Sequence, residues 1–246
     1  MIALISIFTA SYNIFIIISF LIFIHELGHF LCAKILNIEV DKIIIYPLGG
    51  ISKFNLPLNS SQLTEFLILI SGPLFQFLAY ILLKKYYTRY TELIDLYHYG
   101  ILFFNLLPVY PLDGGKLINL LLSYFLPYKL SLKATIFISY VFILLLILMN
   151  CKHIYINLII IIIFLVYKVA KEQVKIPEIY NKFLLERYLN KYKFKHSKII
   201  NSKEKFYRNR RHLIKVGDKY YLEDEYLEKK YRNYKKSVDY LKSTML

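Results

Sequence analysis

The sequence HELGH at residues 25–29 lies inside an apolar run that is long enough to cross a membrane. A charge-capable side chain at bilayer depth costs at least a few kcal/mol, so three of them within five positions need a compensating partner. On a helix, His25 and His29 share one face and can bind one metal ion. Glu26 then lies beside that ion, close enough to serve as general base. The run therefore predicts a zinc hydrolase built inside a membrane.

The rest of the chain supports an all-α polytopic membrane protein with about five to six transmembrane helices. Its 246 residues are 57% hydrophobic. Apolar runs of about 20 residues, the length that a hydrocarbon core of roughly 30 Å requires, recur through the first 170 positions. We expect active-site helices at about residues 13–34, 66–83 and 97–119, followed by spans at 132–149 and 154–167.

Proline and glycine residues are expected to interrupt two of the predicted helices. Gly72-Pro73 is expected to interrupt the second span and to let a neighbouring helix approach closely. Pro108 and Pro111 are expected to break the third span. Between the first two spans, the β-branched run and turn residues of 43–58 predict a short membrane-associated β-hairpin, or else a connecting loop. The edge of such a hairpin can bind an extended substrate strand.

A basic segment follows the last span. From Lys171 onward there are 21 of the 32 Lys and Arg residues, against 10 of the 17 Asp and Glu residues. We therefore expect a transmembrane domain at 1–171 and a basic cytoplasmic tail at 172–246, in keeping with the positive-inside rule. The tail either binds anionic lipid or an acidic partner, or is solvated without a specific ligand. No nucleic-acid motif accompanies the charge, so no nucleic acid is expected.

Within this tail we expect two local structures. Residues 183–187 favour a helix that continues from the last span, and residues 212–222 favour a hairpin with an Asp-containing turn.

Two histidines leave a catalytic zinc site incomplete, because such sites usually have three protein ligands and a water. Asp113 is the best candidate for the third ligand, since it is an acid inside an apolar span that prolines have opened. Asp95 and Glu65 are poorer candidates, because they lie near span ends where water solvates them. Cys32 lies one turn beyond His29 and is a possible ligand, but a small apolar filler is the favoured interpretation.

Asn105 lies deeper in the same span as Asp113. It is a candidate donor to the carbonyl oxygen of the reacting peptide, and a hydrogen bond to a neighbouring helix is the alternative. In the predicted chemistry, zinc lowers the pKa of a water toward about 7 and Glu26 accepts its proton.

Three motifs together resemble the site-2 protease family of intramembrane metalloproteases: HELGH on an early helix, SGP on the next, and NLLPVYPLDGG on the third. The resemblance implies that His25, His29 and Asp113 bind one Zn²⁺ ion and that Glu26 activates water. The layout from Ile7 to Leu189 is similar to family members that process sporulation sigma factors.

That closer likeness implies a pro-sigma-K-like membrane-associated substrate, inhibitory membrane proteins, and the mother-cell membrane around the forespore as the location. Such members also carry a cytoplasmic CBS domain, for which the 56 residues after Asn190 are too few and too basic.

Two other functions stay open at this point. A metal or proton transporter also uses intramembrane His, Glu and Asp, although its polar residues form a pathway rather than one cluster. A catalytically silent regulatory membrane protein would keep the site without turnover. A purely structural role for the histidines would leave Glu26 and Asp113 buried without purpose.

Overall fold

The structure is a computed structural model. It describes residues 12–38, 40–46, 49–54, 56–151, 156–190, 192–194, 196–201 and 205–232. The chain forms two compact units, one built from residues 1–56, 60–108 and 112–117, the other from 57–59, 109–111 and 118–246. The domain boundary predicted at residue 171 falls inside a long helix and stays a prediction.

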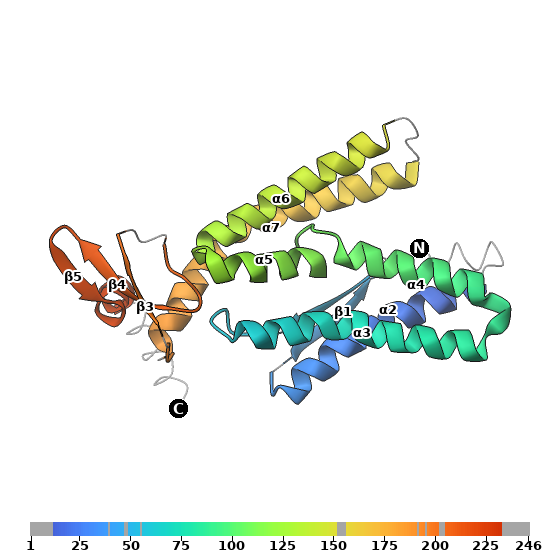
Figure 1. The fold of residues 1–246 in the computed structure, drawn as a ribbon, viewed down its shortest axis with the longest axis horizontal. Helices are drawn as coiled ribbons and strands as arrows, with labels where there is room; N and C mark the ends of the chain where they lie inside the picture. The colour runs from blue at the N-terminus through green and yellow to red at the C-terminus, as the bar shows by residue number, and fades with distance from the viewer. Residues whose placement is uncertain are drawn as a thin grey trace, which may run out of the picture. The chain divides into compact units, whose positions relative to one another are not determined.

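Three helices of the first unit pack against one another, as Figure 1 shows. They are α2 (Tyr12–Ile35), α3 (Gln62–Tyr86) and α4 (Thr91–Leu106), with a short 3₁₀ turn, η1 (Thr88–Tyr90), before α4. Their shared core contains Ile17, Leu21, Tyr80 and Ile94. The predicted hairpin is confirmed, since β1 (Val40–Tyr46) pairs antiparallel with β2 (Gly49–Phe54).

The prolines act differently in the second and third predicted spans. α3 continues through Pro73, so the predicted interruption there is wrong. Neighbouring helices let membrane helices tolerate a proline. The stretch predicted as one broken span at 97–119 is instead two helices, α4 and α5 (Asp113–Phe125). Pro108 and Pro111 stand between them, where a residue without an N–H cannot extend a helix.

Among the described residues, three helices are long and apolar enough to cross a membrane: residues 14–35 of α2, all of α3, and α6 (Tyr128–Met149). The total of five to six spans stays a prediction. In the second unit α6 packs against α7 (Ile156–Leu189), which runs without a break into the tail. The predicted helix at 183–187 is therefore confirmed as the end of α7.

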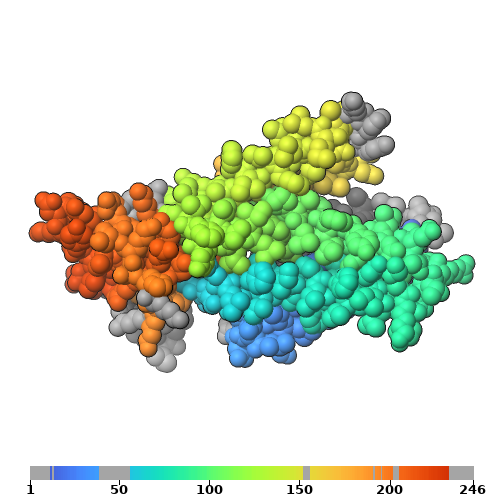
Figure 2. All heavy atoms as spheres, viewed as in Figure 1, coloured from blue at the N-terminus to red at the C-terminus, as the bar shows by residue number. Residues whose placement is uncertain are grey.

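A small sheet follows α7. The predicted hairpin is confirmed as β4 (Arg211–Val216) and β5 (Lys219–Leu222), with Gly217 at a φ of 61° in the turn. The sequence did not predict β3 (Ser197–Ile200), which pairs parallel to β4. In the space-filling view the orange and red atoms of this part form one contiguous mass (Figure 2). The fold is mostly helical as expected, with more β structure than expected in the tail.

Arg187 joins the end of α7 to this sheet. Its buried guanidinium donates to the Glu223 carboxylate at 2.8 Å, to Asn59 Oδ1 at 2.7 Å and to the Tyr207 carbonyl at 2.6 Å. Burial alone would raise the pKa of Glu223, but a hydrogen bond from His212 and the Arg187 charge hold it below its usual range. The resulting stabilisation is present above the ordinary carboxyl pKa and is lost as the pH falls through the folded value.

Replacing Arg187 with leucine is expected to destabilise the sheet by about 3 kcal/mol, because it leaves the Glu223 carboxylate buried without its cation. The backbone amides of β3 to β5 should then exchange roughly 100-fold faster in a hydrogen-exchange measurement. Arg211→Leu is the matched control, since the Arg211–Asp224 pair is also short, at 2.6 Å, but is exposed. An exposed pair contributes about 1 kcal/mol or less. Equal effects of the two variants would contradict this account.

Candidate metal centre

Two buried histidines on α2 face the same side of the helix. His25 and His29 are four residues apart, which places both rings on one face. Both are almost fully buried, and their rings meet edge to face with centroids 4.9 Å apart. Their Nε2 atoms lie 3.2 Å from each other. The predicted pairing of these two residues is therefore what the helix produces.

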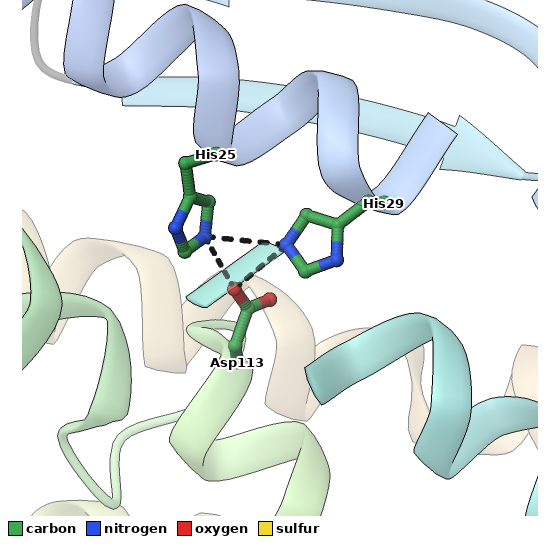
Figure 3. A group of neighbouring side chains, drawn as sticks. All are labelled: His25, His29 and Asp113. Carbon is green, nitrogen blue, oxygen red and sulfur yellow. Dashed lines mark hydrogen bonds and ion pairs between the residues drawn. The ribbon is translucent and has the colours of Figure 1, made fainter. Parts of the chain in front are cut away.

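Asp113 meets both histidines from the first turn of α5. Its Oδ2 lies 3.1 Å from Nε2 of His25 and 3.1 Å from Nε2 of His29 (Figure 3). The carboxylate is buried, although it lies 84 and 88 positions away from the histidines in sequence. Within the described residues these three side chains form the group that could hold a metal ion.

The residue after Asp113 fixes where the carboxylate can lie. A Cβ atom on Gly114 would collide with the carbonyl oxygen of Leu106 and approach that of Leu107 to 2.5 Å. The start of α5 thus packs directly on the backbone at the end of α4. One turn later, Lys116 Nζ lies 3.1 Å from the second carboxylate oxygen, Oδ1. Asp113 therefore presents Oδ2 alone to the histidines.

A close crossing of α2 and α3 positions His29. A Cβ atom on Gly28 would lie 2.6 Å from the Ser71 carbonyl oxygen, so the two backbones nearly touch there. The close approach predicted for this part of α3 is confirmed. At this crossing His29 Nδ1 donates to the Ile68 carbonyl oxygen at 2.7 Å. The main chain of α3 thus fixes the ring of His29.

This geometry suits a zinc ion. A carbonyl oxygen only accepts, so Nδ1 of His29 carries the hydrogen, and in the neutral ring that binds a metal the Nε2 lone pair points toward Asp113. An acceptor nitrogen and a carboxylate oxygen then face each other at 3.1 Å, an arrangement that a cation stabilises. Atoms bound to a tetrahedral zinc at about 2.0–2.1 Å lie about 3.3 Å apart, close to the observed separations.

The other predicted residues lie in different surroundings. Glu26 is buried beside His25 on α2, while Asn105 is half-buried in the last turn of α4. Cys32 is half-buried and does not belong to the metal-binding group of the described residues. Asp95 forms an ion pair with Lys84 at 3.0 Å, which removes it as a candidate ligand. Glu65 accepts a hydrogen bond from Ser60 at 3.3 Å.

Comparison with known proteins identifies the family. Residues 13–90 match the model of peptidase family M50. The chain is 32% identical over 201 residues to stage IV sporulation protein FB of Bacillus subtilis. The match covers 77% of this chain and 69% of that protein. The chain belongs to peptidase family M50. The resemblance to site-2 proteases predicted from the three motifs is therefore confirmed.

Two further matches come from Methanocaldococcus jannaschii. A zinc metalloprotease is 30% identical over 178 residues, or 68% of this chain and 50% of that protein. The solved structure of a site-2 protease matches with a TM-score of 0.53 and 27% identity, over 64% of this chain and 76% of that one. The chain is thus an integral membrane zinc metalloprotease with a His-His-Asp metal-binding group, and the transporter interpretation falls away.

Two residues near the ligands escaped the sequence analysis. Gln76 is fully buried and contacts His25, and Lys116 contacts Asp113. Gln76 is a polar residue inside the second apolar run, and this position alone could have marked it as a candidate in the sequence. Lys116 follows Asp113 by three residues, which is the spacing of neighbours on a helix.

Proposed function

We propose that this M50 protease hydrolyses a peptide bond of a membrane-associated protein, with Glu26 as the general base. The observation that carries the proposal is the convergence of three ligand atoms within 3.2 Å of one another. Two of them come from a membrane-spanning helix that also bears Glu26, and the third comes from α5. When bound, zinc supplies a Lewis acid that lowers the pKa of a water and polarises a carbonyl.

Glu26 accepts the proton of the attacking water and returns it to the leaving amine. Glu26 follows His25 directly and is buried. Its carboxylate is therefore shielded from bulk solvent and lies next to a metal ligand, where a proton acceptor for the attacking water is needed. Asn105 donates a hydrogen bond to the carbonyl oxygen of the scissile peptide as negative charge develops there. Its place in the last turn of α4, eight residues before Asp113, supports that role.

An extended segment of the substrate pairs with the edge of the β1–β2 hairpin. A helical peptide hides its carbonyls, so a membrane-embedded substrate must be unwound before cleavage. Adding a strand to an exposed hairpin edge unwinds the peptide and satisfies its backbone hydrogen bonds together. Among the described residues β1 and β2 pair only with each other, in the antiparallel register from Val40 with Phe54 to Tyr46 with Gly49, so each strand keeps one edge for a further strand.

The substrate is a pro-sigma-K-like sigma factor precursor that is cleaved during sporulation. Similarity to a stage IV sporulation protein supports this choice, as does the layout shared with sigma-factor-processing proteases. The basic tail, residues 172–246, then lies in the cytoplasm next to the transmembrane domain, residues 1–171. By the same likeness, the protease lies in the mother-cell membrane around the forespore, and inhibitory membrane proteins keep it silent until cleavage is due.

The decisive experiment expresses the chain together with a membrane-tethered pro-sigma-K substrate. Wild-type protease should yield a shorter product that appears on an immunoblot, and Glu26→Gln should yield none. A product with both proteins would assign the cleavage to the host and contradict the role of Glu26. No product from a zinc-loaded wild-type protein would overturn the proposed substrate.

A further inference from the structure

A buried glutamine on α3 connects the metal site to α4. Gln76 on α3 has no exposed surface, and its amide reaches two neighbours. Its Oε1 lies 2.9 Å from Nδ1 of His25, and its Nε2 lies 3.1 Å from the carbonyl oxygen of His98 on α4. Nε2 is also 3.4 Å from Nδ1 of His98. The amide thus bridges a metal-binding ring on α2 and the backbone of α4.

Only one orientation of this amide satisfies both contacts. The His98 carbonyl oxygen can only accept, so the amide nitrogen of Gln76 must face it as the donor. Its oxygen must then face Nδ1 of His25, which therefore carries the hydrogen. The reverse orientation would place two oxygens against each other at α4. The backbone of α4 thus determines, through Gln76, which nitrogen of His25 is protonated.

We propose that Gln76 is a positioning residue that keeps His25 in the tautomer whose Nε2 lone pair is free for zinc. His29 obtains the same tautomer from the main-chain oxygen of Ile68. The two rings therefore depend on different kinds of acceptor, one from the backbone and one from a side chain. Outer hydrogen bonds of this kind fix the ring orientation and raise the basicity of a histidine ligand.

Two substitutions separate this role from simple packing. Gln76→Leu removes the acceptor for His25 and the donor to His98, whereas Gln76→Glu keeps an acceptor oxygen for His25 and loses the donor. If Gln76 positions His25, leucine should weaken zinc binding by about 10- to 100-fold and glutamate should retain most of the affinity. A residue that only joins α3 to α4 would be impaired to the same degree by both changes.

The test measures zinc affinity by competition with a chelator, using the full chain purified in detergent. Absorption of the Co²⁺-substituted protein reports the ligand geometry without any need for turnover. Asn119→Leu is the matched control, because Asn119 is also a buried amide with a side-chain hydrogen bond, to Thr135 at 3.1 Å. It should bind zinc like the wild type, with an unchanged cobalt spectrum.

Each outcome decides the inference. A loss with leucine, a recovery with glutamate and an altered cobalt spectrum with leucine alone would support it. Unchanged affinity in Gln76→Leu, or equal losses in both Gln76 variants, would overturn it. Because affinity and spectrum do not depend on cleavage, a wrong assignment of the substrate or of Glu26 would leave this result intact.

Discussion

Replacement of Glu26 by glutamine is expected to slow peptide hydrolysis by about 10²- to 10⁴-fold while the zinc content stays unchanged. Glutamine has nearly the same size as glutamate and fits the same buried position on α2. It cannot accept a proton from water, so the chemical step loses its base while the three ligands keep their places. Single-turnover cleavage and metal analysis of the same purified sample measure the two quantities together.

Glu65→Gln is the control for this variant. Glu65 lies in the first turn of α3 and accepts a hydrogen bond from Ser60, so its replacement should leave both cleavage and zinc content at wild-type levels. Wild-type cleavage by Glu26→Gln would show that another group is the base. A loss of zinc from Glu26→Gln would show that the carboxylate supports the metal rather than the proton transfer.

The sequence predicted the metal ligands because their chemistry conflicts with their surroundings. His25, His29 and Asp113 are polar residues in apolar runs, where the cost of burial already implies a common partner. The spacing of the histidines determines their shared face, and Pro108 and Pro111 predict that the helix is opened next to Asp113. Local rules of this kind also predicted the β1–β2 hairpin and the β4–β5 hairpin.

What the sequence could not predict depends on contacts between segments far apart in the chain. β3 pairs parallel with β4. Parallel strands are not joined by a tight turn, so no short-range turn motif in the sequence indicates this pairing. The continuation of α3 through Pro73 depends on the neighbouring helices rather than on proline itself. Likewise, the partners of Gln76 lie 51 and 22 positions away, and only the packed helices bring them together.

Replacement of Gly72 by alanine is expected to weaken zinc binding by more than the roughly 100-fold upper limit seen when an outer hydrogen-bond partner is lost. A Cβ atom at this position would collide with Nε2 and Cε1 of the His29 imidazole, and would lie 2.8 Å from its Cδ2. The ring must then swing away, so the site loses a ligand rather than a neighbour of a ligand. Zinc affinity and cleavage should fall together.

Gly100→Ala is the matched control, because a Cβ atom on this α4 glycine meets nothing within 4 Å. Alanine is favoured over glycine in a helix interior by about 1 kcal/mol, so this variant should fold at least as well as the wild type and keep its zinc. Full zinc binding by Gly72→Ala would show that His29 lies elsewhere in the folded protein. A loss confined to Gly72→Ala would show that the crossing of α2 and α3, as much as the ligands themselves, determines whether the site forms.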